Sequence, residues 1–579
     1  MSKSNLKPTF LDRPQTAAHL IIKSLHRRGL RRIYGLTGGH IKPLWDEAHI
    51  AGIDIISVRH EAAAVHMAQA HADLTGELAI ATVTTGPGFT NAFSGIVTAD
   101  IARSPVLILV GRPPTPQLGM RSLEDLDHVS ISRPITRYAN TIDKSYHVLW
   151  KLDDAIAAAL GLDGRQGAAM LDIPIDILRT VVPKNFQDSR LLDPRPCQHY
   201  LPDPTHVEDA AEILRQSQRP LVISGRGAFG AGNELRRFLQ ESGAMYLDTK
   251  SSRGLISIAH ENYMSAVRAR AMAECDLIVT LGAQLDFELG YGSTALFAAK
   301  PKLVRVGRSS DELHETRRAD VAIRGEIAQC LKALMTVGVR SKSLDKDWFS
   351  TLRVVNNEKQ NALAEKCAIQ PTVNGRLHPL RLLSVVNQFI DENTIVIVDG
   401  GDIFSFARVA LKTPCYMDTG PFGCLGVGVP FAVAAASLFP ERRVLAVIGD
   451  GAFGFNAMEL ETAARIGAKA VFVIVNNGAW NIERCDQIFN FGGRIVGTEI
   501  PGCRYDQLAQ SLGAHGEHVE TIEELPGALE RAIENGPSVV DVAVTRDAIS
   551  PDFKSGLAEL PEYQALRTWN DAEEMKLKN

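Results

Sequence analysis

The sequence predicts an α/β protein of three doubly wound parallel-sheet domains followed by a C-terminal tail. Short apolar runs rich in Val and Ile alternate with segments of helical periodicity, which is the pattern of parallel sheets with helices on both faces. The 579 residues suffice for about three to four domains of ~150 residues each. Two stretches interrupt the alternation. They divide the chain into a first domain at 1–185, a linker at 186–204, a central domain at 205–340, a linker at 341–375, a third domain at 376–544 and a tail at 545–579.

Composition argues against several classes of protein. With 45% hydrophobic and 22% charged residues, the chain has the make-up of an ordinary globular protein. Its net charge of −5 gives no general attraction to nucleic acid or anionic membranes. The eight cysteines are scattered without metal-ligand spacing, which favours a reducing compartment. No signal-peptide core and no apolar run of about 18 residues is found. We therefore expect a cytoplasmic protein with neither a nucleic-acid nor a membrane partner.

The first domain opens with an amphipathic helix at 16–29 and continues in βα alternation. Apolar runs and helical periodicity predict the further elements, namely strands at 32–36, 53–57, 78–84, 106–110 and 168–173 and helices at 61–74 and 91–102. Glu61 directly follows a strand and begins an alanine-rich helix. An acid at this position is favourable to the helix dipole, so the residue type alone requires no catalytic role.

The central domain carries a glycine-rich loop that follows a strand. The strand at 220–225 leads into GRGAFG at 225–230, a helix at 233–242 and a strand at 245–248. This matches the GxGxxG fingerprint of dinucleotide-binding folds, with Asp248 about 20 residues further on. An NAD-dependent oxidoreductase is therefore one interpretation. The other is an ordinary βα turn that needs glycines for close packing.

In the third domain, polar residues follow two strands. A strand at 444–448 ends in Gly449-Asp450-Gly451; a helix closed by Gly467 and a strand at 470–475 then lead to Asn476-Asn477. Because parallel strands end at the same edge of the sheet, Asp450 and Asn477 are expected to converge. Carboxylate and amide oxygens suit Mg²⁺ or Ca²⁺, and such ions usually also hold a phosphate.

The GDG and NN segments, joined by one helix and one strand, resemble the signature of thiamine-diphosphate-dependent enzymes. VRHEAAAVHMAQAHA at 58–72 resembles the helix of these enzymes that carries the activating glutamate. GLTGGHIKPLWD at 35–46 and TTGPGFTNAFSGIVTADIARSPVLILVG at 84–111 resemble the acetolactate-synthase-like branch in particular. The resemblance extends over nearly the whole chain. It implies thiamine diphosphate and Mg²⁺ as cofactors.

The resemblance also implies roles for individual residues. Glu61 would bond the aminopyrimidine ring of the cofactor and promote its imino tautomer. The metal would be held by Asp450, Asn477 and the backbone oxygen of Ala479. Leu425, in the glycine-rich loop that begins the segment 419–436, would force the cofactor into a V shape. The complete set of expected cofactor-binding residues is Glu61, Gly401, Asp402, Gly423, Leu425, Gly451, Ala452 and Asn477.

Two further residues are expected to face the substrate. Glu483 lies where the similar pyruvate decarboxylases have a catalytic glutamate, and His40 stands beside a Gly-Gly turn. The pattern is closest to 2-hydroxyacyl-CoA lyases and oxalyl-CoA decarboxylases. It predicts cleavage of a 2-hydroxyacyl-CoA to formyl-CoA and an aldehyde or ketone. The alternatives are a 2-oxo-acid decarboxylase and an acetolactate-synthase-like carboligase. The intact Glu61, Asp450 and Asn477 argue against an NAD-dependent oxidoreductase and against a non-catalytic regulator.

Family resemblance extends to the central domain and to assembly. That domain binds FAD in acetolactate synthases and the ADP part of coenzyme A in the acyl-CoA enzymes, which assigns Arg226, Gly227 and Arg308 to a nucleotide. Gln284 and Gly307 depart from the acyl-CoA pattern, where Arg and a ribose-binding Asp are usual. The family's sites are shared between subunits, so we expect a homodimer or homotetramer.

The tail at 545–579 is too apolar for a dispensable terminus. Phe553, Leu557, Leu560, Tyr563, Leu566 and Trp569 would not remain in water. We expect the tail to dock on the body. One interpretation makes it a lid over the site, with Arg546 and Lys554 meeting the phosphates of an acyl-CoA; the other is packing on the back of the domain.

Overall fold

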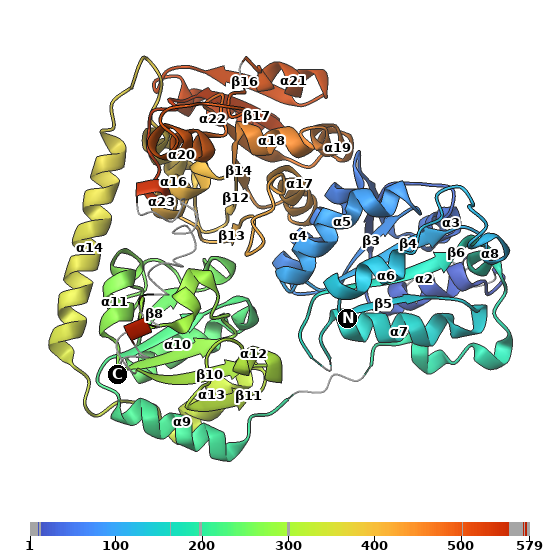
Figure 1. The fold of residues 1–579 in the computed structure, drawn as a ribbon, viewed down its shortest axis with the longest axis horizontal. Helices are drawn as coiled ribbons and strands as arrows, with labels where there is room; N and C mark the ends of the chain where they lie inside the picture. The colour runs from blue at the N-terminus through green and yellow to red at the C-terminus, as the bar shows by residue number, and fades with distance from the viewer. Residues whose placement is uncertain are drawn as a thin grey trace.

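The chain forms three parallel sheets, each flanked by helices (Figure 1). The computed structural model describes residues 10, 13–162, 164–195, 200–297, 301–500, 502–554, 571, 574 and 575. The sheets contain six, five and six strands, and every strand pairing within them is parallel. The predicted α/β class with three doubly wound sheets is thereby confirmed. The sheets lie within the predicted domains, whose exact boundaries stay predictions.

The first sheet has the strand order β2-β1-β3-β4-β6-β5. Its strands are β1 (Arg32–Gly35), β2 (Asp54–Ser57), β3 (Ala79–Val83), β4 (Val106–Arg112), β5 (Tyr138–Thr141) and β6 (Ala168–Pro174). Its helices are α2 (Ala17–Arg27), α3 (Lys42–Ala51), α4 (Glu61–Thr75), α5 (Pro87–Ile101), α6 (His128–Ser132), α7 (Val148–Ala159) and α8 (Ile175–Arg179). The chain winds outward in opposite directions from β1 and β3. A crevice at the carboxyl ends of these two strands is where such sheets bind ligands.

The central sheet has the order β11-β10-β9-β7-β8, with its switch of direction between β7 and β9. Its strands are β7 (Pro220–Ser224), β8 (Met245–Asp248), β9 (Leu277–Leu281), β10 (Lys302–Gly307) and β11 (Val321–Arg324). Its helices are α9 (Pro204–Gln216), α10 (Gly232–Ser242), α11 (Arg268–Glu274), α12 (Ser310–His314) and α13 (Ile327–Val337). The loop at 225–230 therefore lies at a switch point.

The third sheet has the order β13-β12-β14-β15-β17-β16 and switches direction between β12 and β14. Its strands are β12 (Ile395–Asp399), β13 (Tyr416–Met417), β14 (Val444–Gly449), β15 (Ala470–Asn476), β16 (His515–Val519) and β17 (Ser538–Ala543). Its helices are α15 (Pro379–Val386), α16 (Asp402–Ala410), α17 (Gly428–Leu438), α18 (Asp450–Asn456), α19 (Glu459–Ile466), α20 (Asn481–Asn490), α21 (Tyr505–Ser511), α22 (Leu525–Asn535) and α23 (Pro551–Lys554).

The first and third domains share one hydrophobic core. Helix α4 packs on α17, and residues of both sheets join a single buried cluster. Both helices are rich in alanine, which lets their backbones approach closely; the buried alanines are Ala63, Ala64, Ala68, Ala70 and Ala72 in α4 and Ala432, Ala434, Ala435 and Ala436 in α17. The two domains are thus packed as one body.

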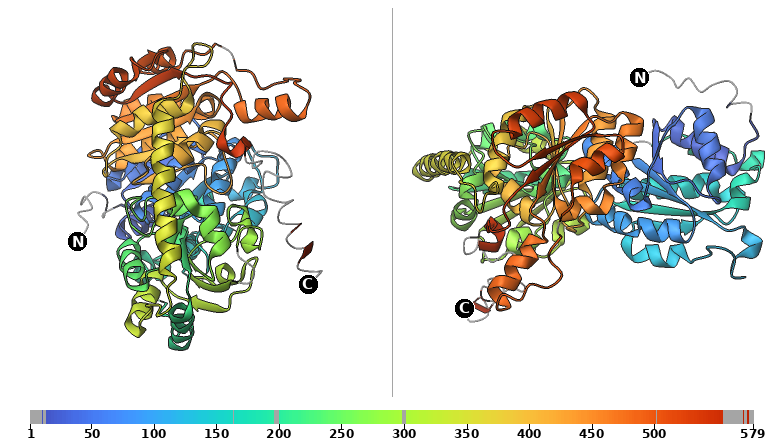
Figure 2. Two further views of the ribbon diagram at one scale, coloured as in Figure 1. Left: turned by 90° about the vertical axis from the view of Figure 1, so that its left-hand side faces the viewer. Right: turned by 90° about the horizontal axis from the view of Figure 1, so that it is seen from above.

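Several elements differ from the sequence predictions. The linker predicted at 341–375 contains one 23-residue helix, α14 (Lys346–Ala368), which runs along the outside from the central to the third domain (Figures 1 and 2). The single helix expected after Gly449 is two, α18 and α19. Helix α5 begins at Pro87, earlier than predicted, because Pro fits the first turn of a helix. Among the described residues no helix is long and apolar enough to span a bilayer.

Candidate functional site

Asp450 and the loop 477–479, which hold the predicted metal ligands, lie side by side at the carboxyl ends of the neighbouring strands β14 and β15. Asp450 is only 3% exposed, and its Oδ2 accepts a hydrogen bond of 2.8 Å from the Gly478 N–H. Asn477 Oδ1 accepts one of 3.0 Å from the Ala479 N–H. The structure therefore brings the Asp450 carboxylate to the loop 477–479, as strand order predicted.

The environment of Asp450 fits a cation. Burial raises its pKa to about 6, against the opposing effect of the backbone N–H groups of Gly451, Gly478 and Ala479. A buried carboxylate without a positive neighbour is costly, and a divalent ion would offset that cost. The predicted ligands Asp450, Asn477 and the Ala479 carbonyl offer oxygens, which Mg²⁺ prefers, and this assignment stays a prediction.

Two helices begin at this edge and face each other. Asn481, the first residue of α20, donates a hydrogen bond of 3.0 Å to Asp402, the first residue of α16. Within the described chain, Oδ1 of each residue is buried without a hydrogen-bond partner. Burial raises the pKa of Asp402 to about 6. The two unpaired oxygens are acceptors and call for a donor or a cation, whereas the N–H groups at the two helix N-termini suit an anion.

Close packing explains the glycines of the GDG segment. A Cβ on Gly451 would lie 2.5 Å from the ring of Trp480, so that position admits only glycine. Ala452 is buried in α18. Gly401 is exposed, with a side-chain position 3.4 Å from Ile482. The backbone is thus exposed at Gly401, whereas the Trp480 ring packs against Gly451.

The loop before α17 is fixed from both sides. Asp399 Oδ2 accepts hydrogen bonds from the N–H groups of Gly426 (2.9 Å) and Gly428 (2.8 Å). Asn456 donates a bond of 2.7 Å to the Gly426 carbonyl. Leu425 is half-buried against the core shared by the first and third domains. Gly423 takes φ +68°, which glycine adopts without strain.

Glu61 lies where the sequence placed it, at the first position of α4. It is 7% exposed, and its Oε2 accepts a hydrogen bond of 3.0 Å from Asn91 in α5. Sequence reasoning missed Asn91, although it stands in the segment that carried the resemblance. Within the described chain, the Glu61 carboxylate is hydrogen-bonded to a residue of the first domain, and the Asp450 carboxylate to residues of the third domain.

His40 lies at the switch point of the first sheet, after β1. Its Nδ1 is 3.5 Å from Thr84 Oγ1 and 3.7 Å from Glu124 Oε2. Burial lowers its pKa, so the neutral ring is favoured. Glu483 is exposed in the first turn of α20. Among the described residues, no hydrogen bond or ion pair joins His40 to Glu483, and each role stays a prediction.

A buried pair that the sequence did not reveal supports the turn near Glu61. His128 and Asp172 are both fully buried, and His128 Nδ1 lies 3.0 Å from Asp172 Oδ1. The Gly86 N–H donates a 3.0 Å hydrogen bond to His128 Nε2. The ring must therefore accept at Nε2 and donate from Nδ1 to Asp172. This fixes the turn that leads into α5 and Asn91.

In the central domain, the expected nucleotide-binding residues already have partners. Arg226 forms a 2.5 Å ion pair with Asp73 of α4, and Arg308 forms one of 3.1 Å with Glu326. A Cβ on Gly227 would lie 2.8 Å from the Cα of Gly282, so this glycine serves backbone packing.

The cavity at this junction of domains measures about 70 Å³, far below the ~300 Å³ or more of typical ligand pockets. Its lining includes the charged residues Asp73, Arg103, Arg226, Lys250 and Asp418. Asp248, the residue expected to bond an NAD ribose, accepts a 2.9 Å hydrogen bond from Tyr263 and is buried. As they stand, these residues do not fit a nucleotide.

Comparisons with known proteins agree with this geometry. Three family models match the chain: the N-terminal TPP binding domain of thiamine pyrophosphate enzymes at 15–131, the central domain at 207–334 and the C-terminal TPP binding domain at 401–542. Acetolactate synthase large subunit IlvG of Mycobacterium tuberculosis is 32% identical over 94% of this chain and 98% of its own length. 2-Hydroxyacyl-CoA lyase 2 of Mus musculus is 30% identical over 85% and 83%, and that of Homo sapiens 28% over 92% and 90%.

Proposed function

The chain belongs to the thiamine pyrophosphate enzyme family, and we propose that it is a thiamine-diphosphate- and Mg²⁺-dependent carbon–carbon lyase. Its substrate would be a 2-hydroxyacyl-CoA, and its products formyl-CoA and an aldehyde or ketone. The observation that carries the cofactor proposal is the convergence of Asp450 with the loop 477–479 beside the unpaired oxygens of Asp402 and Asn481. Relatives named 2-hydroxyacyl-CoA lyase 2 support the substrate class.

The residues divide between holding the cofactor and moving protons. Asp450, Asn477 and the Ala479 carbonyl would hold Mg²⁺, with the backbone at Gly401, Asp402, Gly451 and Ala452 facing the diphosphate. Gly423 and Leu425 would support the rings. When bound, thiamine diphosphate supplies the carbon nucleophile and the electron sink. Glu61 would exchange a proton with the aminopyrimidine ring.

Two side chains remain for the substrate. Glu483, exposed at the start of α20, would take the proton of the substrate hydroxyl and return it, a role typically worth 10²–10⁴-fold in rate. Burial keeps His40 neutral near Glu124, so His40 would orient the substrate by a hydrogen bond. Closing the site against water would protect the carbanion that follows bond cleavage.

A second copy of the chain would complete the site. Glu61 and Asp450 each bond only within their own domains, yet both must touch one cofactor. Large apolar side chains near the candidate site are exposed in the single chain, namely Phe422, Phe455, Met458, Phe489, Phe491 and Val496. Exposed apolar surface of this kind marks interaction sites. We propose a homodimer or homotetramer with sites shared between subunits.

Two alternatives keep the same cofactor chemistry. A 2-oxo-acid decarboxylase is favoured by the position of Glu483, six residues after Asn477. An acetolactate-synthase-like carboligase is favoured by the relative of that name. Arg226 and Arg308 each already pair with a carboxylate, Asp73 and Glu326, which weakens their assignment to the phosphates of coenzyme A and counts against the lyase.

One assay separates the three activities. Purified enzyme with thiamine diphosphate and Mg²⁺ is given 2-hydroxyacyl-CoA thioesters, 2-oxo acids or pyruvate, and formyl-CoA, CO₂ and acetolactate are measured. The lyase proposal expects formyl-CoA from at least one thioester, with a large loss in Glu483→Gln. CO₂ release with neither formyl-CoA nor acetolactate would support the decarboxylase, and CO₂ with acetolactate from pyruvate would support the carboligase.

A further inference from the structure

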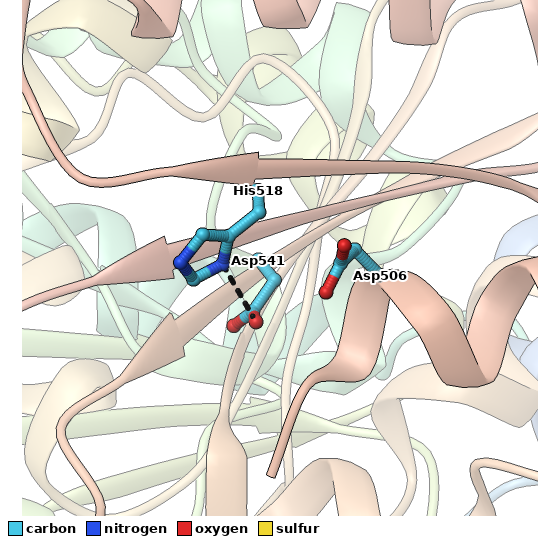
Figure 3. Close-up of side chains that lie close together, drawn as sticks. All are labelled: Asp506, His518 and Asp541. Carbon is cyan, nitrogen blue, oxygen red and sulfur yellow. Dashed lines mark hydrogen bonds and ion pairs between the residues drawn. The ribbon is translucent and has the colours of Figure 1, made fainter. Parts of the chain in front are cut away.

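A buried carboxylate in the third domain is connected to both sides of the candidate metal site. Asp541 in β17 is fully buried. It lies beside His518 in β16 and Asp506 in α21 (Figure 3). Such a group of an imidazole and two carboxylates has the composition of a metal site, but its atoms are already engaged. Asp506 accepts two hydrogen bonds of 2.8 Å from the guanidinium of Arg504, which places a cation there without any metal.

Asp541 accepts from three donors. Its Oδ1 accepts a hydrogen bond of 2.9 Å from the Asn476 side chain. Its Oδ2 lies 3.1 Å from His518 Nδ1 and accepts a bond of 3.3 Å from the Tyr505 N–H. Asn476 is the residue immediately before the expected metal ligand Asn477. The carboxylate therefore holds the side chain of the residue directly before the predicted metal ligand Asn477.

The Tyr505 contact leads to the other side of the site. Its hydroxyl donates a hydrogen bond of 3.3 Å to the main-chain carbonyl of Asp450. The Asp450 side chain accepts from Gly478, which follows Asn477. The contacts thus close a circuit that runs from Asp541 through Asn476, the loop at 477–478, Asp450 and Tyr505 back to Asp541. The links between these parts are hydrogen bonds. The circuit is covalent only within the chain segment 476–478 and within the residues Asp450, Tyr505 and Asp541 themselves.

We propose that Asp541 is a positioning residue that holds Asn477 and Asp450 in the geometry required by Mg²⁺ and the diphosphate. The proposed role of Asp541 rests on the proposed function, in which the protein binds thiamine diphosphate and Mg²⁺. Residues that orient metal ligands typically change metal affinity or activity by about 10–100-fold when mutated. A neutral amide at position 541 would present a donor toward groups that themselves donate, so Asp541→Asn breaks part of the circuit at nearly constant volume.

Calorimetry on the cofactor-free protein tests the proposal without relying on activity. We expect Asp541→Asn to weaken binding of thiamine diphosphate in the presence of Mg²⁺ by about tenfold or more. Asp506→Asn is the matched control: the same isosteric change in the same cluster, on a residue that does not contact Asn476. Its affinity should stay within about twofold of the parent.

A double-mutant cycle adds a readout that a merely structural role would not move. If Asp541 acts through Asn476, Asn476→Ala and Asp541→Asn together weaken binding little more than the stronger single change. Additive losses would overturn the proposal, as would equal affinities in Asp541→Asn and Asp506→Asn. Should Asp541→Asn fail to fold, Tyr505→Phe tests the other arm, because it removes only the bond to Asp450. Unchanged affinity in that variant and in Asn476→Ala would also overturn it. A parent protein that binds no thiamine diphosphate refutes the proposed function instead.

Discussion

The carboxylate of Glu459, in the third domain, accepts the backbone N–H of His60 at 3.1 Å across a separation of 399 residues. The same oxygen accepts the Arg59 N–H at 2.9 Å. Both donors lie in the turn immediately before Glu61, and Glu459 is 1% exposed. The third domain thus fixes the start of the helix that carries the candidate proton-transfer group.

Glu459→Ala should therefore lower activity, although Glu459 is not one of the residues expected to contact the cofactor or the metal ion. Small displacements of a catalytic group cost up to about 10²-fold in rate, and we expect a loss of tenfold or more in kcat. Faster hydrogen exchange at 57–64 should accompany it. Glu461→Ala is the control, because that neighbour is a surface partner of Arg465. Equal activity in the two variants would show that the contact is dispensable.

Glu61 and Asp450 provide a test of the shared site. Glu61→Gln should keep cofactor binding and lose most activity, because an amide cannot exchange the required proton. Asp450→Ala should lose cofactor retention, because the metal site loses its only carboxylate. After subunit exchange, a mixture of the two inactive variants should regain activity, since one site of the mixed dimer carries neither change. A mixture that stays inactive after proven exchange, or an active monomer in sedimentation, would contradict a site shared between subunits.

The convergence at the third sheet could be predicted because it follows from local rules. Buried parallel strands read as apolar runs, and their carboxyl ends share one edge, so Asp450 and Asn477 had to meet. The edge strands β5 and β16 escaped prediction because their polar, half-exposed residues carry no apolar signal. Long-range partners escaped for another reason: the bonds of Glu459 depend on how two domains dock.

Sequence signals were also ambiguous where one residue type serves two purposes. The glycines at 225–230 match a nucleotide fingerprint, but Gly225 and Gly227 are required by contact with the backbone at 282–283. Likewise, the positive charge of Arg226 would suit a phosphate, but Arg226 forms an ion pair with Asp73. Only the packing distinguishes these cases, so spacing alone could not decide between them.

Asp399 makes stability depend on pH. Burial raises its pKa to about 7, and its Oδ1 has no hydrogen-bond partner in the described structure. Because the folded-state pKa lies above the unfolded value, the folded protein prefers the protonated acid. The contribution of Asp399 to the free energy of unfolding is fully present below about pH 4 and is lost as the pH rises to about 7. The rise of about three units in its pKa corresponds to at most ~4 kcal/mol of that free energy.

Asp399→Asn should reduce this loss of stability. The amide resembles the protonated acid and keeps one oxygen to accept the Gly426 and Gly428 N–H groups. Melting temperatures measured from pH 5 to pH 8 should therefore fall less steeply in the variant, which should be the more stable protein at pH 8. A parallel decline in both proteins would assign the pH dependence to other groups.

The charge pairing of the central cleft predicts that the purified protein carries no flavin. Its spectrum should lack flavin absorbance, and added FAD should not raise its melting temperature. Arg226→Ala should lower the melting temperature by breaking the contact between the central and first domains. Asp73→Asn, which frees Arg226, serves as the paired variant. A flavin spectrum, or stabilisation of the parent by ADP that Arg226→Ala abolishes, would establish a nucleotide site.

The first part of the tail lies next to the candidate site. In α23, Asp552 forms an ion pair with Arg408, and its N–H donates a 2.8 Å hydrogen bond to Ser405 Oγ. Phe553 is 8% exposed and stacks on Phe489 with 5.3 Å between ring centroids. Helix α23 is thereby held against α16 and α20, the helices that begin at Asp402 and Asn481. The apolar residues at 557–569 lie outside the described part of the chain.

Two truncations separate a lid from a packing role. Ending the chain after Ser550 removes α23 and everything beyond it, whereas ending it after Lys554 keeps α23. If the tail closes the site, both proteins should bind thiamine diphosphate normally, and both should show a much lower kcat/KM with acyl-CoA, because the carbanion is no longer shielded from water. If only the packing of α23 matters, the shorter protein loses stability and the longer one behaves like the parent. Parent-like kinetics in both truncated proteins would rule out the lid.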